Sequence, residues 1–462
     1  MKYKEILRRL TQHDFDAALV GGVVRDSVTK VVLYPSMHEI PGCYDIDIAT
    51  SATPKEIFEL FPDAIVKYVG QQFGVTLVDN YEVATYRKDI HNGIGNKCCS
   101  VEYTTSLEDD LSRRDFTVNA MAYRYLRESD SFEFVDPFGG VRDVHKRRID
   151  FVGDPEKRIL EDPTRMIRAA RMSAITGFQL TQKTLDAIRD NKELALSEIS
   201  PERVRLEILK AMKTDTPSIF WNTLLKTGIL ALIFPEFASC FGFDGGKHHR
   251  ETVWEHLMLA GDSISKKYPL LRLSGYLHDV GKPLAYDSET GSFIAHQAVG
   301  ADLTETFMCN YKFSSAEIQK VVKLVRSHMI MQKDSSPKGF RKAIAKLNGR
   351  NVCIYDFMRL RLADTGANLK RRTENGPIKI SDIKELISIF DKYQFEKGVA
   401  LKTSDLALSG NDIMQILGIP SGPKVGEILR HLHEVVHQNP ELNTREELVK
   451  VLIEMENSCA EV

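Results

Sequence analysis

Leu19-Val20-Gly21-Gly22-Val23-Val24-Arg25-Asp26 is the stretch that decides the fold of the first part of the chain. Its apolar beginning predicts a strand and its second half predicts a helix, so the glycine pair lies at the turn between them. Glycines at such a turn let backbone N–H groups approach phosphate oxygens. Arg25 would then hold the same phosphate, although an ordinary strand-to-helix turn would show the same pattern.

A pair of carboxylates follows in Tyr44-Asp45-Ile46-Asp47-Ile48-Ala49. Strand alternation puts Asp45 and Asp47 on one face, and aligned oxygen ligands suit Mg²⁺, which takes further ligands from water and substrate phosphates. Glu82, in a later predicted strand, offers a third carboxylate. Three carboxylates near a phosphate-binding turn match what two-metal phosphoryl transfer requires, whereas most isolated Asp-x-Asp pairs are turns or solvated strand edges.

Adjacent arginines occur in Leu111-Ser112-Arg113-Arg114-Asp115. On a helix they would point about 100° apart, so that one reaches a triphosphate while the other pairs with an acidic neighbour such as Asp110. A surface ion-pair cluster is the plainer interpretation of this segment taken alone.

A second arginine series, Arg165, Arg168 and Arg171, recurs every three residues and would form one oblique stripe on a helix. The preceding Asp162-Pro163 is a typical helix start, with Asp as N-cap and Pro at the first position. A solvated basic stripe is the plainer interpretation. In the functional one, Arg and carboxylate side chains offer paired donors and acceptors to the edge of a nucleobase.

The chain of 462 residues suggests about three domains. Predicted strands (Ala17–Val20, Val75–Val78, 82–86 and 132–135) end before residue 150, and apolar spacings of three and four dominate afterwards. We therefore expect an α+β protein, with a mixed-sheet head followed by helices. The expected boundaries are 1–150 for the head, 151–225 for a helical neck, 226–375 for a helical body and 376–462 for a helical tail.

Composition narrows the classes of function. Hydrophobic residues make up 43% and charged residues 27%, as in soluble globular proteins, and no apolar run approaches the ~18 residues of a membrane span. Seven cysteines without CxxC spacing, and no signal-peptide core, predict a cytoplasmic location. Because the net charge is −2 and the tail has nine basic against fourteen acidic residues, nucleic-acid contacts would depend on local patches.

Histidines and aspartates recur across the predicted body. A single histidine on a helix is usually structural, but an adjacent His-Asp pair with further imidazoles and a later carboxylate forms a good ligand set for a transition metal. The candidate ligands are His256, His278, Asp279, His296, His328 and Asp364.

The ordered motifs GGVVRD, DID, EVATYR, RRDFTVNAMAY, DPFGG and EDPTRMIRAAR resemble those of the class II (bacterial-type) tRNA nucleotidyltransferases, whose head is polymerase beta-like. The resemblance implies that the triphosphate is held by Gly21, Gly22, Arg25 and Arg114. It implies catalytic carboxylates at Asp45, Asp47 and Glu82, with Mg²⁺ on the two aspartates. It implies base recognition of CTP and ATP by Asp162 and Arg165, in a pocket that is also lined by Arg168 and Arg171.

The histidine set resembles the HD phosphohydrolase superfamily. His256, His278, Asp279 and Asp364 match its H…HD…D pattern. His296 and His328 match the extra positions of its two-metal members. This resemblance implies a site for Ni²⁺, Mn²⁺ or Co²⁺ and a phosphohydrolase activity, which some such domains have lost.

Together these resemblances imply template-independent addition of CCA to tRNA 3′ ends from CTP and ATP. The alternatives are a bacterial poly(A) polymerase, or an HD phosphohydrolase whose head only binds nucleotide. The acidic tail, and the similarity of residues 410–429 to the tRNA-side tail of CCA-adding enzymes, favour the first. Residues 27–43 form a longer link than the family pattern predicts, and residues 87–100 a mobile loop. The sequence leaves open the oligomeric state and whether CCA, CC or A alone is added.

Overall fold

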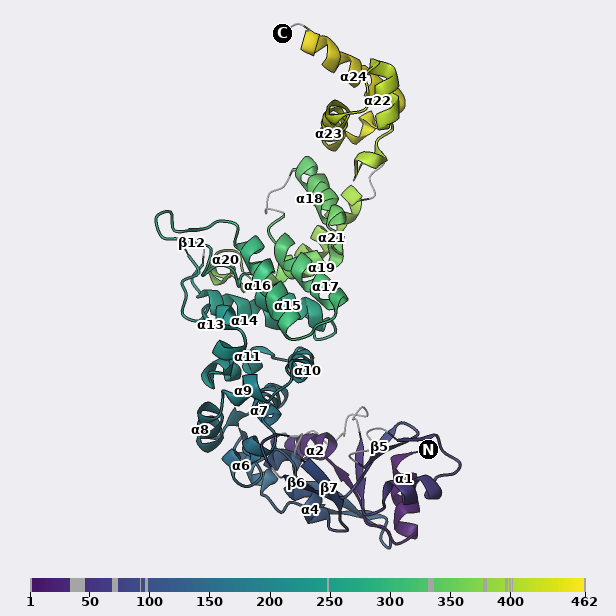
Figure 1. Ribbon diagram of the computed structural model, residues 1–462, viewed down its shortest axis with the longest axis vertical. Coiled ribbons are helices and arrows are strands. Elements are labelled where there is room, and N and C mark those ends of the chain that lie inside the picture. Colours follow the sequence, from purple (N-terminus) through teal and green to yellow (C-terminus); the bar gives the residue numbers. More distant parts are fainter. Residues whose placement is uncertain are drawn as a thin grey trace. The chain divides into compact units, whose positions relative to one another are not determined.

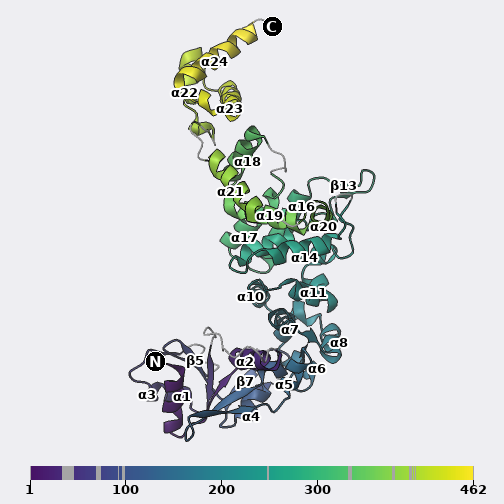
Figure 2. The ribbon, with the colours of Figure 1, turned by 180° about the vertical axis from the view of Figure 1, so that it is seen from behind.

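The computed structural model describes residues 2–33, 46–68, 74–91, 93–95, 99–246, 249–330, 336–376, 380–394, 398, 400 and 402–460. The chain divides into two compact units, Met1–Pro235 and Glu236–Val462. The first contains a mixed sheet and helices and the second is almost entirely helical (Figures 1 and 2). The predicted α+β architecture is confirmed. None of the described helices is long and apolar enough to cross a membrane.

The first unit is built on a seven-stranded sheet with the order β3-β4-β5-β2-β1-β8-β9. Only β2 and β5 pair in parallel; the other neighbours are antiparallel. The strands are β1 (Ala17–Val20), β2 (Asp47–Thr50), β3 (Val66–Tyr68), β4 (Val75–Val78), β5 (Tyr81–Thr85), β8 (Ala122–Leu126) and β9 (Ser131–Val135).

The central strand β1 is buried at all four positions because it has partners on both sides. Its alternate residues Ala18 and Val20 join Tyr86, Leu107 and other apolar side chains in one core cluster. The chain then turns at Gly21 into α2 (Gly22–Leu33). This core therefore fixes the point at which the glycine turn leaves the sheet.

Helices cover the head and continue beyond it. They are α1 (Tyr3–Gln12), α3 (Pro54–Leu60), α4 (Leu107–Ser112), α5 (Gly140–His145), α6 (Pro155–Glu161), α7 (Thr164–Thr176), α8 (Gln182–Asp190), α9 (Leu194–Ser197), α10 (Pro201–Ala211), α11 (Ser218–Lys226) and α12 (Ile229–Ile233). Helix α7, which carries the arginine series, packs against α10 and α11.

Three segments differ in detail from the sequence expectation. Residues 87–100, expected as a loop, contribute to a hairpin of β6 (Arg87–His91) and β7 (Cys99–Tyr103), paired from Arg87↔Tyr103 to His91↔Cys99. Short strands also occur after residue 150: β11 (Gln179–Leu180) pairs with β10 (Arg148–Ile149), and β12 (Tyr286–Asp287) pairs with β13 (Ser292–Phe293). Of the link at 27–43, helix α2 covers the part up to Leu33, and the rest lies outside the described residues.

Among the described residues of the second unit, two clusters of buried apolar side chains can be distinguished. Leu271, Leu324, Phe357 and Phe390 belong to the larger one, which joins several of its helices. The last three helices enclose a smaller core of their own. The helices are α13 (Pro235–Ala238), α14 (Val253–Ser263), α15 (Pro269–Leu277), α16 (His296–Asn310), α17 (Ser315–Ser327), α18 (Pro337–Gly349), α19 (Ile354–Ala367), α20 (Leu369–Asn375), α21 (Ile380–Gln394), α22 (Gly410–Leu417), α23 (Pro423–Gln438) and α24 (Arg445–Ala460).

Candidate nucleotide site and metal centre

The glycine turn lies directly against a carboxylate. Gly21 has a φ of +75°, and a Cβ atom there would lie 3.0 Å from Asp47 Oδ2 and 3.6 Å from Arg114 Nη1. A side chain at this position would require an unfavourable backbone conformation and would crowd both charged groups. The turn therefore needs glycine for two reasons, and it brings Gly21, Asp47 and Arg114 together as the sequence predicts.

Two of the three predicted carboxylates lie on neighbouring strands. Asp47 begins β2 and is the register partner of Glu82 in β5. Because directly opposed residues in a parallel pair point to the same face, both side chains project from one side of the sheet. Glu82 is exposed. It is not among the described residues that line the cavity beside Asp47. Asp45 lies outside the described residues.

A cavity of about 610 Å³ adjoins the turn. Nine of the predicted nucleotide-site residues line it, although they come from segments up to 150 positions apart in the sequence. They are Gly21, Gly22, Arg25, Asp47, Arg114, Asp162, Arg165, Arg168 and Arg171. Sequence reasoning assigned no site role to the remaining lining residues, Arg87, Asp89, Arg113, Asp115, Asn119, Met172 and Arg203.

Each arginine of the α7 series has a carboxylate partner. Arg165 Nη1 donates to Glu161 at 2.9 Å, Arg168 Nη2 donates to Asp115 at 2.5 Å, and Arg171 Nε donates to Glu207. Asp115 raises the pKa of Arg168, against the opposing effect of burial. Burial would raise the pKa of Asp115, but Arg168 and hydrogen bonds lower it overall. The stripe is therefore held in place by ion pairs with buried carboxylates.

The adjacent arginines differ from the prediction. Helix α4 ends at Ser112, so Arg113 and Arg114 follow the helix instead of lying on it. Both pair with the buried Asp110, at 2.6 Å and 3.1 Å. One carboxylate with two oxygens serves both guanidinium groups, which keeps them side by side at the cavity wall.

Asp162 lies between α6 and α7. Its Oδ1 accepts a hydrogen bond from Thr164 N at 3.1 Å and lies 3.5 Å from Arg203 Nη1. The sequence predicts Pro163 in the first position of this helix, but α7 begins one residue later, at Thr164. The carboxylate thus has a local structural partner and also faces the cavity.

Arg25 is held by Asn119, a residue to which the sequence pattern assigns no role. Its Nη1 donates to Asn119 Oδ1 at 2.9 Å, and Asn119 Nδ2 donates to Asp115 Oδ1 at 3.1 Å. Arg25, Asn119, Asp115 and Arg168 therefore form one connected network. Asp115 and Asn119 stand in the quoted RRDFTVNAMAY motif, but only the fold brings Asp115 to Arg168.

The six predicted metal ligands converge in the second unit. His256 lies on α14, His278 and Asp279 directly follow α15, His296 begins α16, His328 follows α17, and Asp364 lies on α19. Asp279 Oδ1 lies 3.2 Å from His296 Nε2 and 3.3 Å from His328 Nε2. Asp364 Oδ1 lies 3.2 Å from His256 Nε2 and 3.7 Å from His278 Nε2.

The second nitrogen of each imidazole is held by the surrounding protein. His278, His296 and His328 place Nδ1 2.9, 2.8 and 2.7 Å from the carbonyl oxygens of Gly275, Phe293 and Val325. Donation from Nδ1 leaves Nε2 as the lone-pair nitrogen, which is how proteins orient histidine ligands. Within the described part of the chain, the buried Nε2 of His278 has no hydrogen bond. The donor set therefore fits a metal ion.

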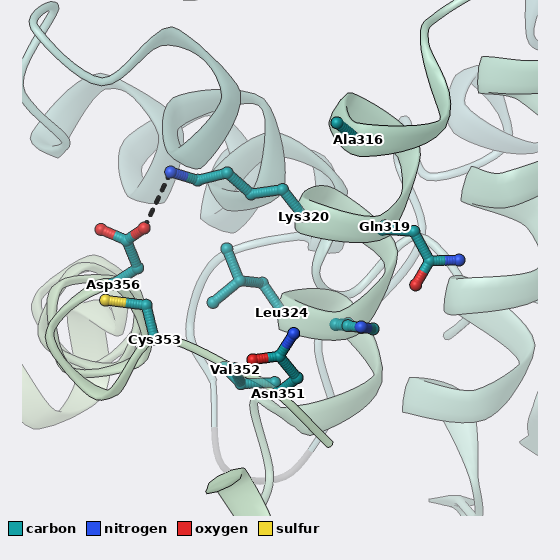
Figure 3. A pocket seen from close by; sticks show the side chains of 9 residues that line it. Ala316, Gln319, Lys320, Leu324, Asn351, Val352, Cys353 and Asp356 are labelled. Atoms are coloured by element: carbon teal, nitrogen blue, oxygen red, sulfur yellow. Dashed lines mark ion pairs between the residues drawn. The ribbon is translucent and has the colours of Figure 1, made fainter. Parts of the chain in front are cut away.

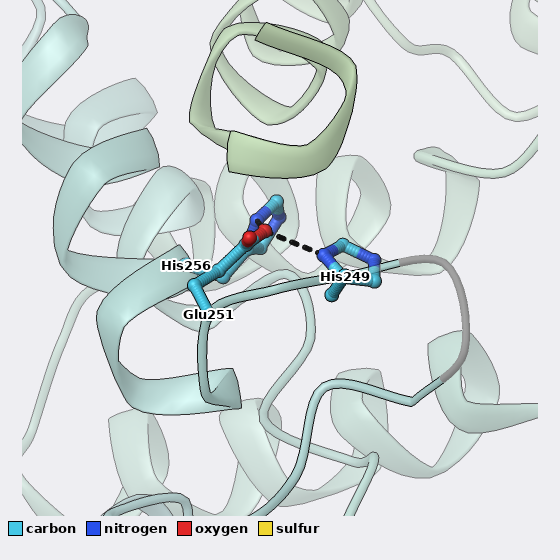
Figure 4. Close-up of side chains that lie close together, drawn as sticks. All are labelled: His249, Glu251 and His256. Atoms are coloured by element: carbon cyan, nitrogen blue, oxygen red, sulfur yellow. Dashed lines mark hydrogen bonds and ion pairs between the residues drawn. The ribbon is translucent and has the colours of Figure 1, made fainter. Parts of the chain in front are cut away.

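The Nδ1 atom of His256 faces a carboxylate, where the other three histidines face a backbone carbonyl (Figure 4). Glu251 Oε1 lies 3.2 Å from His256 Nδ1 and 2.6 Å from His249 Nδ1. Burial would lower the pKa of His256, but Asp364 and Glu251 raise it to about 9. Glu251 also accepts from the backbone N of Leu369 at 3.0 Å, so it is fixed by three separate segments.

A groove of about 380 Å³ in the second unit has no comparable chemistry (Figure 3). Leu324 and Val352 contribute apolar surface, and Lys320 pairs with Asp356 at 2.9 Å across it. We assign it no site.

The chain matches three family descriptions in sequence order. "Poly A polymerase head domain" matches residues 17–150, "Probable RNA and SrmB- binding site of polymerase A" matches residues 177–241, and "HD domain" matches residues 247–394. The A-adding tRNA nucleotidyltransferase of Deinococcus radiodurans is 34% identical over 346 residues, 71% of this chain and 75% of that protein. A CCA-adding enzyme of a Geobacillus species is 30% identical over 453 residues, 97% of this chain and 95% of that protein.

This chain belongs to the bacterial-type (class II) tRNA nucleotidyltransferases. The crystal structure of the Bacillus stearothermophilus CCA-adding enzyme in complex with CTP is 26% identical to this tRNA nucleotidyltransferase, with a TM-score of 0.64 and coverage of 100% of both chains. The complex structure of a CCA-adding enzyme with ATP, 18% identical, has the same fold with a TM-score of 0.60. The predicted family, with its HD domain, is confirmed.

Proposed function

We propose that this tRNA nucleotidyltransferase adds C, C and A to tRNA 3′ ends, with CTP and ATP as substrates and the cytoplasm as its location. One observation carries the proposal: the glycine turn, Asp47 and the α7 arginines line the same cavity. The relatives named as CCA-adding enzymes, and the related structure with CTP, point the same way.

Different residues at the cavity bind the triphosphate and the metal ions. Arg25, Arg114 and the backbone at Gly21–Gly22 bind the triphosphate, because a cationic wall and free approach to backbone N–H groups favour a polyanion. Asp47 and Asp45, supported by Glu82, would hold two Mg²⁺ ions. When bound, these ions would lower the charge on the α-phosphate and activate the RNA 3′ hydroxyl, and pyrophosphate leaves.

Base selection falls to Asp162 and Arg165. A carboxylate and a guanidinium offer acceptors and donors that match the Watson–Crick edges of cytosine and adenine. Arg168 and Arg171 would complete the pocket wall. In this division residues 1–150 perform the chemistry, 151–225 read the base, 226–375 form the HD domain, and the tail at 376–462 contacts tRNA.

A direct experiment offers tRNA ending before C, before the second C and before A, with CTP and ATP supplied separately. Incorporation of C into the first two and of A into the third supports CCA addition. A alone on the third would assign an A-adding enzyme, as in the Deinococcus relative. Long A tracts on any RNA would assign a poly(A) polymerase, the alternative that the head-domain match keeps open.

The six predicted metal ligands of the second unit, which we call the histidine–aspartate cluster or HD cluster, favour a second function, a metal-dependent phosphohydrolase. We propose that the four histidines and two aspartates bind Ni²⁺, Mn²⁺ or Co²⁺, since imidazole and carboxylate together suit these ions. A metal there would polarise a phosphoryl oxygen and supply a nucleophile near neutral pH. Metal analysis of the purified protein, with phosphomonoester hydrolysis measured for each ion, tests it. An empty site without hydrolysis would make the domain a structural relic.

A further inference from the structure

The hairpin β12–β13 carries aromatic side chains on its surface. Tyr286 and Phe293 are register partners, with ring centroids 5.5 Å apart. Phe243 lies 5.6 Å from Tyr286 and 6.4 Å from Phe293. These three residues, with Ile294, form what we call the aromatic shelf. Tyr286 is 47% and Ile294 71% exposed, so the shelf offers ring surface to solvent, and the hairpin stands out from the helices (Figures 1 and 2).

The shelf is joined to the histidine–aspartate cluster by direct contacts. The carbonyl oxygen of Phe293 lies 2.8 Å from Nδ1 of His296. Lys282 Nζ lies 5.5 Å from the centre of the Phe293 ring and 2.6 Å from Asp279 Oδ2. One buried lysine thus touches both the shelf and a metal ligand.

The cluster is most accessible at two of its members. The His278 and His328 side chains are essentially buried, whereas those of His296 and Asp364 are 10% and 15% exposed. His296 follows Phe293 by three residues, at the foot of the shelf. Arg361 pairs with Asp364 at 2.7 Å, which adds a second cation beside an accessible ligand.

We propose that the aromatic shelf stacks the base of a nucleoside phosphate whose phosphate reaches the histidine–aspartate cluster. The proposal rests on the phosphohydrolase function above and names its substrate class. Every nucleobase offers a π-face to an exposed ring, and Lys282 and Arg361 supply positive charge for the phosphate. In the reaction, a water oxygen bonds to phosphorus, the bond from phosphorus to the ribose oxygen breaks, and that oxygen takes the proton. The products are a nucleoside and inorganic phosphate.

The test uses the full-length protein loaded with Mn²⁺. Hydrolysis of adenosine 5′-monophosphate and of an RNA trinucleotide ending in a 3′-phosphate is compared with that of ribose 5-phosphate, which lacks a base. We expect Tyr286→Ala to raise KM for the base-bearing substrates about fivefold to tenfold, the loss of one stacked ring, with kcat and the KM for ribose 5-phosphate unchanged. Tyr286→Phe should restore the wild-type KM. Tyr355→Ala, a matched exposed tyrosine on α19, should change neither.

A second readout is independent of hydrolysis. Tyr286→Trp puts a fluorescent ring on the shelf, and base stacking should quench it, whereas nucleotide bound in the head cavity should leave it unchanged. Quenching by adenosine 5′-monophosphate or by the RNA end, but not by ribose 5-phosphate, supports the proposal and tells free nucleotide from RNA. Quenching without hydrolysis by the wild-type protein would overturn the phosphohydrolase and keep the shelf. Hydrolysis with no base preference and no quenching would overturn the shelf alone.

Discussion

The head cavity and the HD cluster concentrate charge in opposite ways. The cavity is lined by eight arginines, and those whose pairing the structure describes are held by carboxylates, such as Asp115 in the cavity wall and the buried Asp110 behind it. In the cluster, imidazoles and carboxylates face inward and approach one another to between 3.2 and 3.9 Å. A wide cationic wall suits an extended polyanion, whereas a tight set of lone-pair donors suits a small cation. The two compact units therefore support chemistries that should be separable.

The largest effect should come from the head carboxylates. Asp47→Ala and Asp45→Ala should each lower CTP and ATP incorporation by at least about a thousandfold, because transition-state charge loses its metal stabilisation. Incorporation of labelled nucleotide into tRNA lacking its 3′ end measures this. Circular dichroism and tRNA binding should stay near wild type, and the metal content of the HD cluster should not change. Unchanged incorporation would remove both residues from the active site.

The reciprocal change should break the other site alone. The double variant His278→Ala, Asp279→Ala removes one imidazole and the carboxylate that faces all four histidines, so bound Ni²⁺, Mn²⁺ or Co²⁺ should fall to background by elemental analysis. Phosphomonoester hydrolysis should disappear with it, while CTP and ATP incorporation stays within about twofold, since the Mg²⁺ ions that we propose for the head would be held by its own carboxylates. A parallel loss of incorporation, in a variant that still melts cooperatively, would contradict the separation of the two sites.

A smaller effect should distinguish base reading from helix capping at Asp162. If Asp162 and Arg165 recognise the base, Asp162→Ala and Arg165→Ala should each lower the free energy of discrimination among CTP, ATP, UTP and GTP by about 1–3 kcal/mol. As a cap, Asp162 should contribute about 1 kcal/mol to stability, and its loss should leave selectivity unchanged. Nucleotide competition measured beside a thermal melt decides between the roles. Asp154→Ala is the control, because Asp154 caps α6 and does not line the cavity.

The smallest effect concerns the ion pairs that hold the cavity wall. Asp115 has a pKa lowered by Arg168 despite burial, so its contribution to stability is present above the unfolded pKa of about 3.9 and is lost as pH falls toward the folded pKa. Asp115→Asn should lower the free energy of unfolding by about 1.5 kcal/mol at pH 7, with the difference from wild type shrinking below about pH 4. Denaturant titrations at several pH values measure it.

A surface pair provides the control for Asp115. Asp130 pairs with Arg8 at 2.7 Å, and both side chains are about half exposed. Asp130→Asn should therefore change stability much less than Asp115→Asn does, because solvent screens an exposed ion pair. Equal effects of the two substitutions would mean that the pairs of the cavity wall stabilise the protein no more than surface pairs do.

The sequence by itself predicted which parts of the chain would carry chemistry. An apolar strand followed by two glycines, a strand with alternating carboxylates, and a histidine–aspartate pair on helical segments are local patterns that follow from backbone geometry and ligand preference. They were sufficient to predict the α+β head, the helical remainder, and the motifs that place the chain in its family. Strand limits came out within one residue for β1, β4, β5 and β9.

Only the tertiary structure decided how these residues are paired. Asp115 meets Arg168 and Glu207 meets Arg171 across 53 and 36 positions, and Asn119 supports Arg25 across 94. Phe293 lies beside the histidine–aspartate cluster because α16 begins with His296, three residues after it. Periodicity shows which face of an element is apolar, but the partner of a buried charge depends on which elements pack together. Which elements pack together depends on all the apolar side chains of a core. An ionised group is retained inside such a core only where a second segment supplies its counter-charge.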